Sequence, residues 1–380
     1  MFPIEHQSYV ATVRLKQGEY LALSETSSDV AERLLPHFVL PPPKDRDPEK
    51  GRVLTTDEIV YENGLRVGKY WPFRTCLLDP RFLFKRLGTS EAKVWLPRLF
   101  RTAANSNARA IPVCTLADLE GDRLQAFQAI TNPGDVGVAL RLTLRDLGDE
   151  RLQNRVHAAL LKIVALPSQC ILVLDLSGAD FSATESVAEF IVGAFQRVFE
   201  IGRWRRIVTT ATSYPEKNPA EENGEVLLQR NEWDAWNIAV NHDSVIRQNL
   251  MYGDFAADSS KFVFSGGTTP IRHYRYTSEK GWFVVRGSKS IELKATMVDV
   301  ATRIVKSRHF LGKNFSTADR FIFETANGAA SGPGNAMIWR KVNTIHHLTL
   351  IIRDLGRVYG YKIRELAEAE TGFQPDLFRR

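Results

Sequence analysis

Eight short apolar runs, separated by segments with helical periodicity, divide the chain up to Gly253. Several of them, such as CILVL at Cys170–Leu174, are continuously apolar rather than alternating. Continuous apolar runs are typical of parallel strands that are covered on both faces. The eight predicted strands are Tyr9–Leu15, His37–Leu40, Arg74–Leu78, Arg109–Val113, Gly137–Leu142, Cys170–Leu174, Arg205–Thr210 and Asn249–Gly253.

Helical patterns fill the intervals between these runs. The clearest follows Ser182-Ala-Thr-Glu185, which has the sequence of a capping box, and ends at Gly202. Glu150–Ala165 and Ala92–Ala104 carry similar apolar stripes. Strands that alternate with helices pair in parallel through right-handed crossovers. The α/β alternation fits an open doubly wound sheet as well, but the count of eight favours a closed TIM-like (β/α)8 barrel.

The alternation stops after Gly253, where short antiparallel strands and then helices are predicted. We therefore expect a barrel core over residues 1–256, and a hairpin with C-terminal helices over residues 257–380, packed together as one compact unit. The chain has 380 residues, enough for a barrel of about 250 residues and this addition. The later predicted elements are strands at Lys261–Ser265, Ile271–Tyr276 and Trp282–Val285, and helices at Ala295–Ser307 and Trp339–Leu355.

Composition excludes several classes of protein. Hydrophobic residues make up 44% and charged residues 25% of the chain, which is typical of folded globular proteins and not of disordered ones. No apolar stretch approaches the ~18 residues of a membrane span, and the start MFPIEHQSYV lacks a secretory pattern, so we expect a cytoplasmic protein without membrane contact. Three widely spaced cysteines without a CxxC exclude a disulfide framework and a thiolate zinc site.

Polar residues at the ends of the predicted strands are the first candidates for a site, because barrel enzymes carry their chemistry at the carboxyl ends of the strands. Asp175 is the clearest, since it directly follows a buried run. Arg141 lies inside VALRL, where a guanidinium needs a partner or water. Either these residues converge on one polar pocket, or they cap helices and form local salt bridges. The set is Lys16, Glu19, Asp79, Arg141, Asp175 and Asp254.

The predicted hairpin carries a second candidate group. Strand alternation places Arg272, Tyr274 and Tyr276 on one face and His273 and Arg275 on the other, and Arg286 ends the second strand. A guanidinium flanked by aromatic rings suits an anionic or planar ligand. A solvated hairpin face is the alternative interpretation.

A third group lies on the predicted helix near the C-terminus. Trp339, Asn343, His346 and His347 are spaced to share one helix face. Adjacent histidines differ from the i, i+4 spacing of HExxH, so hydrogen bonds to barrel carboxylates or to a ligand are favoured over metal ligation. The sequence also lacks a phosphate-binding GxxxxGK[ST] loop, a dinucleotide fingerprint and a GxSxG elbow.

Four strings resemble the Beta protein family of phages, satellite prophages and bacterial defence islands: YVATVRLKQGEYLAL, MYGDF, YRYTSEKGWFVVRG and WRKVNTIHHLTLIIRDLG. They occur in order between Tyr9 and Gly356. The resemblance implies a barrel-like fold and a role in prophage-encoded conflict with competing phages, beside a partner protein from the same locus. It supplies no catalytic residue. The matching positions are Lys16, Gly18, Glu19, Tyr252, Gly253, Asp254, Arg275, Tyr276, Arg286, Gly287, Trp339, Arg340, Asn343, His346 and His347.

Three functional hypotheses follow. The first is a defence component that binds a phosphorylated ligand, a nucleotide or nucleic acid, at the barrel mouth. The second is a phosphodiesterase or nuclease in which Asp79, Asp175 and Asp254 hold Mg²⁺ and His346 or His347 is the general acid or base. The third is a non-catalytic, antitoxin-like scaffold. Under these hypotheses the catalytic candidates are Asp175, Asp254, His346 and His347, and the ligand-binding candidates are Lys16, Glu19, Asp79, Arg141, Tyr252, Arg272, Tyr274, Arg275, Tyr276, Arg286, Trp339 and Asn343.

Overall fold

The computed structural model describes residues 4–43, 51–131, 137–261, 272–328 and 332–366. Its contacts divide the chain into two compact units, which we describe separately. The barrel unit consists of Met1–Lys16, Leu34–Thr212 and Asn231–Phe255, and the sheet unit of Gln17–Arg33, Ser213–Arg230 and Ala256–Arg380. The strand predicted at Lys261–Ser265 lies outside the described residues, apart from Lys261 itself.

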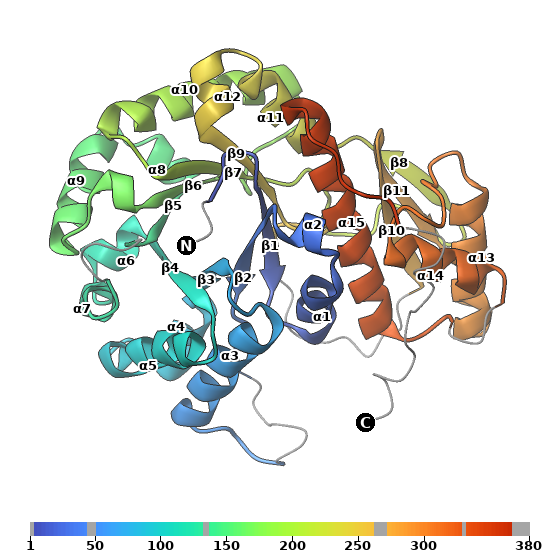
Figure 1. Ribbon diagram of the computed structural model, residues 1–380, viewed down its shortest axis with the longest axis horizontal. Helices are drawn as coiled ribbons and strands as arrows, with labels where there is room; N and C mark the ends of the chain where they lie inside the picture. The colour runs from blue at the N-terminus through green and yellow to red at the C-terminus, as the bar shows by residue number, and fades with distance from the viewer. Residues whose placement is uncertain (1–3, 44–50, 132–136, 262–271, 329–331, 367–380) are drawn as a thin grey trace. The chain divides into compact units, whose positions relative to one another are not determined.

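The barrel unit contains a closed parallel barrel, as predicted, and all eight predicted strands are present (Figure 1). The strands from β1 to β7 each pair with the next one along the chain, and the eighth barrel strand, β9, pairs with β7 and β1. The strands are β1 (Tyr9–Arg14), β2 (Leu34–Val39), β3 (Thr75–Asp79), β4 (Arg109–Thr115), β5 (Ala139–Thr143), β6 (Ile171–Asp175), β7 (Arg206–Thr210) and β9 (Leu250–Asp254).

Closure of the barrel depends on Gly253. This residue pairs with Val10 of β1 on one side and with Thr210 of β7 on the other. A Cβ atom at position 253 would lie 2.8 Å from the carbonyl oxygen of Thr209 and 3.1 Å from that of Val10. Only glycine lets both neighbouring strands approach this closely.

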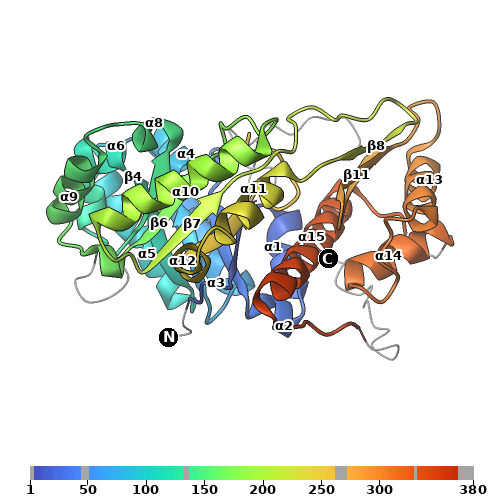
Figure 2. The ribbon, with the colours of Figure 1, turned by 90° about the horizontal axis from the view of Figure 1, so that it is seen from above.

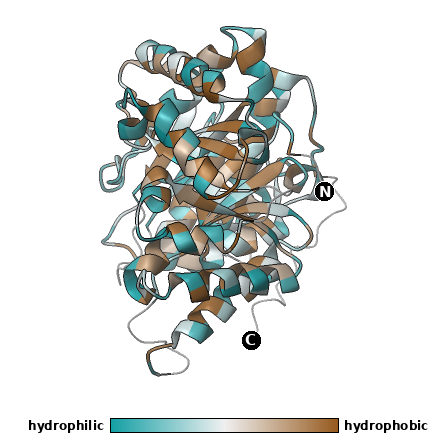
Figure 3. Ribbon diagram, turned by 90° about the vertical axis from the view of Figure 1, so that its left-hand side faces the viewer, coloured by the Kyte–Doolittle hydropathy of each residue, from teal (hydrophilic) through white to brown (hydrophobic). Residues whose placement is uncertain are grey.

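One buried cluster receives apolar side chains from all eight strands, so it must fill the interior of the barrel. Val10, Leu77, Val173 and Met251 are among its members. Figure 3 shows the strands coloured mainly as hydrophobic, whereas the helices around them mix hydrophobic and hydrophilic patches. This pattern explains why the strands appear in the sequence as continuous apolar runs: one face meets the interior and the other meets the helices.

The helices of this unit follow the strands in sequence. The predicted helix after Ser182 is α10, and it ends at Gly202 as expected. The predicted capping box is wrong, because the N-cap is Ala183, which makes no side-chain cap. Instead, the Ser182 amide donates to Asp180 Oδ1 in the preceding turn. The helices are α3 (Thr56–Tyr70), α4 (Arg81–Leu87), α5 (Ala92–Asn105), α6 (Leu116–Glu120), α7 (Leu124–Gln128), α8 (Leu144–Leu147), α9 (Leu152–Lys162), the 3₁₀ turn η1 (Pro167–Gln169), α10 (Thr184–Ile201), α11 (Asn231–Val240) and α12 (Ser244–Asn249).

The sheet unit contains a three-stranded antiparallel sheet in the order β10-β11-β8. The hairpin of β10 and β11 was predicted, whereas β8 was not; Figure 2 shows β8 lying along β11. Among all described residues, no helix is both long and apolar enough to cross a membrane. The elements are α1 (Gln17–Glu25), α2 (Ser28–Ala31), β8 (Glu225–Leu228), β10 (His273–Ser278), β11 (Gly281–Arg286), α13 (Leu293–Lys306), α14 (Thr317–Ala326) and α15 (Ala336–Tyr359).

The division into units differs from the boundary expected at residue 256. Residues 17–33 and 213–230 precede that boundary but belong to the sheet unit. The reason is their packing: α1 lies against α15, and β8 pairs with β11. The sheet unit is therefore assembled from three separate stretches of the chain.

Candidate functional site

A polar layer lies inside the barrel, next to the apolar interior and on its carboxyl side. Side chains two residues apart on a strand share a face. The residues two positions after the interior residues Leu35, Leu77, Ala139, Val173 and Val208 must therefore also point inward. They are His37, Asp79, Arg141, Asp175 and Thr210.

Asp79 is the centre of one half of this layer. Its Oδ2 atom lies 3.5 Å from His37 Nε2 and 3.1 Å from Arg81 Nε, and its Oδ1 atom accepts a hydrogen bond from the Arg81 amide at 2.9 Å. Thr12 Oγ1 lies 3.4 Å from His37 Nδ1. His37 and Asp79 are fully buried, whereas Arg81 is partly exposed.

Arg141 and Asp175 form the other half. Arg141 Nη1 donates to Asp175 Oδ2 at 2.8 Å, and the Ser177 amide donates to Asp175 Oδ1 at 3.0 Å. The side chain of Arg141 is 14% exposed. Its buried Nε atom has no hydrogen-bond partner within the described part of the chain. We call His37, Asp79, Arg81, Arg141 and Asp175 the mouth network.

The charges of the mouth network are coupled. Burial opposes ionisation of Asp79, but the Arg81 guanidinium, the nearby imidazole of His37 and the charge of Arg141 hold its pKa well below the usual range. Burial lowers the pKa of His37 despite the nearby Asp79 carboxylate. Burial also acts against the charge of Arg141, but Asp79 and Asp175 raise its pKa. At neutral pH two guanidinium groups therefore face two carboxylates, and the imidazole is neutral.

Asp254 does not belong to this layer, which corrects the expectation that it projects into the barrel mouth. Because Met251 points into the barrel, Tyr252 and Asp254 point to the opposite face of β9. There Asp254 Oδ1 accepts a hydrogen bond from Tyr9, and Oδ2 accepts one from Tyr252 at 3.2 Å. The rings of Trp233 and Trp236 on α11 lie edge-on to Tyr252. Tyr252 and Asp254 therefore belong to an aromatic layer between the barrel wall and α11.

Two strand-end candidates remain. Glu19 belongs to the sheet unit. Lys16 follows β1 at the carboxyl end of the strand and is half-buried. Its amide donates to the carbonyl of Arg14 at 2.7 Å. Lys16 is the last residue of the first stretch of the barrel unit.

His346 and His347 lie in the interior of the sheet unit, and neither is exposed. His346 Nδ1 lies 3.0 Å from Asp319 Oδ2, and its Nε2 lies 2.7 Å from the carbonyl oxygen of Thr277. His347 Nδ1 lies 2.9 Å from Thr277 Oγ1. The carboxylate that His346 contacts belongs to the sheet unit and is not one of the expected barrel carboxylates. Both histidines connect α15 to β10 through Thr277, so their side chains have a structural role.

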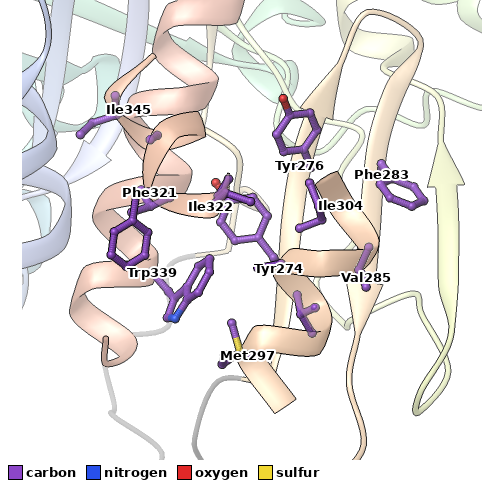
Figure 4. Close-up of a cluster of buried hydrophobic side chains, with 14 of the residues drawn as sticks. Tyr274, Tyr276, Phe283, Val285, Met297, Ile304, Phe321, Ile322, Trp339 and Ile345 are labelled. Carbon is purple, nitrogen blue, oxygen red and sulfur yellow. The ribbon is translucent and has the colours of Figure 1, made fainter. Parts of the chain in front are cut away.

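The aromatic residues of the hairpin are part of the core of the sheet unit, and this corrects the expectation of an accessible ring face. Tyr274 and Tyr276 pack with Phe321, Ile304 and Trp339 in a buried cluster (Figure 4). Tyr276 donates a hydrogen bond to Asp319 at 2.6 Å.

The flanking arginines of the hairpin are bound locally as well. Arg272 Nη1 donates to the carbonyl of Ile291 at 2.7 Å and to Thr296 Oγ1 at 3.0 Å. Arg286 Nη1 donates to the carbonyl of Ala220 at 2.9 Å. Both side chains therefore connect loops of the sheet unit to its hairpin.

Five of the predicted ligand-binding residues do come together in the sheet unit. Tyr274, Arg275, Trp339 and Asn343 line one small hollow, and Glu19 lies 3.9 Å from Arg340, which lines it too. Asp258 joins the two arginines: Arg275 Nη1 donates to its Oδ1 atom at 2.6 Å and Arg340 Nη1 to its Oδ2 atom at 2.8 Å. This hollow is a second candidate site, in the sheet unit.

Sequence reasoning missed His37 and Arg81 in the mouth network and Asp258 in the hollow. The rule that found Asp79 could have found the first two. His37 is the only ionisable residue of the LLPHFV strand, and Arg81 lies two positions beyond Asp79. Asp258 follows the last barrel strand by four residues, and no pattern in the sequence links it to the hairpin.

The carboxylates predicted to hold Mg²⁺ are not arranged for that purpose. Within the described ranges, no three His, Cys, Asp or Glu residues are grouped as metal ligands. Asp79 and Asp175 bind arginines, and Asp254 faces the other side of the barrel wall. The donor set therefore gives no support to metal-dependent hydrolysis.

Comparison with known proteins gives a family but no activity. No curated protein matches the chain. One similar solved structure is a glycoside hydrolase that targets pectin rhamnogalacturonan II, with 10% sequence identity and a TM-score of 0.37. The match covers 68% of this chain and 36% of that one, so the chain spans about a third of the length of that enzyme. The family model described as Beta protein matches residues 9–353, which is most of the chain. This protein therefore belongs to the Beta protein family.

Proposed function

We propose that the barrel binds a phosphorylated ligand, such as a nucleotide or the end of a nucleic acid, at the carboxyl ends of its strands. In this proposal the protein is a binding or sensing component of prophage-type defence against competing phages. The proposal rests on the hydrogen bonding of the Arg141 guanidinium. One of its nitrogen atoms is held by Asp175, and its buried Nε has no partner among the described residues.

A held guanidinium with spare donors is suited to phosphate. Arginine presents five N–H donors in a planar fork that matches two phosphate oxygens at once. The bond to Asp175 fixes the side chain before a ligand arrives, so little rotational freedom is lost on binding. The position also agrees with the general placement of ligands at the carboxyl face of such barrels.

Arg81 supports the same interpretation from a position two strands away from Arg141 in the barrel. It follows β3, is held by Asp79 and is partly exposed. Arg81 and Arg141 interact electrostatically with each other and with both carboxylates. A phosphate dianion that enters here would add negative charge beside two cations, and Lys16 follows β1 at the same end of the strands.

The proposed role in phage defence is based on membership of the Beta protein family. A protein that binds a phosphorylated ligand without converting it needs a second protein that responds to the bound state. We propose that this partner protein is encoded in the same locus. We place the activity in the cytoplasm. Three buried cysteines without disulfide bonds support a reducing compartment.

A scaffold without a ligand is the second candidate, and one observation favours it. The two carboxylates of the mouth network are balanced by the two arginines, so the network is electrically neutral without any ligand. In a scaffold, these ion pairs would only fix the ends of the strands. The two candidates differ in whether Arg141 contacts anything beyond the protein.

Titration calorimetry with a panel of nucleotides and short oligonucleotides separates them. At least one phosphorylated compound should bind, and Arg141→Gln should weaken its binding at least about tenfold because a charge-assisted bidentate contact is lost. Arg206→Gln is a matched control, since Arg206 is a half-buried arginine that begins β7 at the opposite end of the barrel. The proposal fails if no phosphorylated compound binds, or if both variants bind as tightly as the wild type.

A further inference from the structure

The hollow in the sheet unit lies between β10 and α15. It is lined by His273, Tyr274 and Arg275 of the strand and by Trp339, Arg340 and Asn343 of the helix. The space inside it is about 30 Å³, within a wider recess of about 290 Å³ that includes open solvent. A cavity of this size holds a water molecule or two, or the end group of a larger molecule that extends outward.

Three buried polar atoms belong to residues that line the hollow and have no partner in the described structure. One is the hydroxyl of Tyr274. The other two are Asn343 Oδ1 and Trp339 Nε1, on side chains that are 6% and 3% exposed. Figure 4 shows the indole nitrogen of Trp339 on the edge of the ring that is turned away from Tyr274. Buried polar atoms are nearly always hydrogen-bonded, so these atoms predict a partner that is not part of the protein.

Most of the polar groups around the hollow are hydrogen-bond donors. The indole of Trp339 can only donate, and the guanidinium groups of Arg275 and Arg340 carry only donors. The amide of Asn343 presents either its oxygen or its nitrogen, because the two orientations have the same shape. Each arginine uses one nitrogen atom on Asp258, and Arg275 also lies over the ring of Tyr214 at 4.8 Å. Both are therefore fixed while their other N–H groups remain available.

The electrostatic potential in the hollow favours an anion. Burial lowers the pKa of His273 to about 3, and the charges of Arg275, Arg340 and Arg286 act in the same direction, against the smaller opposing effect of Asp258. His273 is therefore neutral at physiological pH. Burial disfavours a charge of either sign, so only the charged neighbours set the sign of the local potential. The three arginines outweigh Asp258 there, which favours an anion over a cation.

From the donor-rich lining, the two fixed arginines and the unpartnered Asn343 and Trp339, we infer that this hollow binds the oxyanionic end group, carboxylate or phosphate, of a small ligand. The size of the enclosed space limits the bound part to such a group, and the rest of the ligand extends into the open recess. The inference concerns the sheet unit alone and does not depend on the proposed ligand of the barrel.

The indole proton of Trp339 reports on this site directly. The full chain contains seven tryptophans, so its ¹⁵N-labelled form gives seven indole signals, and Trp339→Phe identifies the relevant one. We expect sodium phosphate or sodium acetate to shift the Trp339 signal in a saturable way, and sodium chloride at equal ionic strength to leave it in place. Comparison of the phosphate and acetate titrations shows which oxyanion is preferred.

Asn343→Asp tests the site with almost no change in shape, because it replaces the amide with a carboxylate that repels an oxyanion. The oxyanion affinity read from the Trp339 signal should fall at least about tenfold. Asn327→Asp is the matched control, since it makes the same charge change at an exposed position at the end of α14. If Asn343→Asp does not fold, Arg275→Gln serves in its place with the same expected loss.

Two results would overturn the inference. One is a Trp339 signal that neither phosphate nor acetate moves in the folded wild-type protein, which would make the hollow a water site. The other is an oxyanion-induced shift that is equally strong in Asn343→Asp or Arg275→Gln, which would place the bound ion elsewhere.

Discussion

Several buried charged residues in both units have a specific partner of opposite charge. Arg141 with Asp175 in the barrel unit, and Lys341 with Glu25 at 2.6 Å in the sheet unit, are examples. A buried pair of this kind contributes little net stability when intact, but removal of one member leaves the other charge uncompensated. The mouth network is therefore sensitive to substitutions that change charge and not size.

Asp175→Asn should show this sensitivity. It leaves the Arg141 guanidinium beside a neutral amide, and we expect the free energy of unfolding to fall by about 3 kcal/mol. Chemical denaturation of the two proteins at neutral pH measures the difference. Asp180→Asn, at an exposed turn, is the control and should change stability by less than about 1 kcal/mol. A change of equal size in both variants would mean that the Arg141 pair is not the cause.

His273 gives a pH-dependent prediction. Its folded-state pKa of about 3 lies far below the ordinary value of 6.5. Between these two values the unfolded chain takes up a proton that the folded chain does not, so His273 makes stability fall as the pH falls. His273→Gln lacks this effect. The stability of the wild type relative to the variant should therefore decrease by about 1 kcal/mol between pH 7 and pH 5. Parallel pH profiles would contradict the prediction.

At the scale of elements, the sequence best predicted the strands that are buried on both faces. All eight barrel strands were predicted because an interior layer and a helix layer both demand apolar side chains, as in Ile171–Asp175. The strand β8 was missed because only half of EVLL is covered, which leaves a short and ambiguous pattern. Asp254 was assigned to the wrong face because a continuous apolar run does not reveal which of its residues point inward.

Helix packing predicts opposite changes in stability when two helix glycines are replaced by alanine. A Cβ atom at Gly18 in α1 would lie 2.7 Å from Arg340 Cγ of α15 and 3.0 Å from the carbonyl of Met337, whereas a Cβ atom at Gly193 in α10 would meet nothing within 4 Å. Gly18→Ala should destabilise the protein by about 1–3 kcal/mol through overpacking. Gly193→Ala should stabilise it by about 0.5–1 kcal/mol, because alanine is the better helix former.

Thermal unfolding of the two variants, compared with the wild type, measures these changes. Gly18→Ala should also alter the hollow, since it pushes on a residue that lines it. An unchanged or raised unfolding temperature in Gly18→Ala would show that α1 and α15 are not packed as closely as described.

At the scale of the whole molecule, the two candidate sites belong to different units: the mouth network to the barrel unit and the hollow to the sheet unit. From the sequence we expected the strand-end residues to converge on one pocket, and the helix histidines to bond to barrel carboxylates or to a ligand. Three of the candidate residues meet in the mouth network and five around the hollow, because the chain crosses between the units several times and neighbours in sequence separate. Lys16 and Glu19 show the effect: they are three positions apart and belong to different units. A linear pattern does not encode that division.

The central claim is that a phosphorylated ligand binds at the mouth network. A crystal structure of the full chain with the tightest-binding compound from the calorimetric panel tests it most directly. We predict phosphate oxygens within hydrogen-bond distance, about 3 Å, of the Arg141 guanidinium, with the bond between Arg141 and Asp175 retained. A phosphate bound by other residues, with Arg141 contacting only Asp175, would contradict the claim.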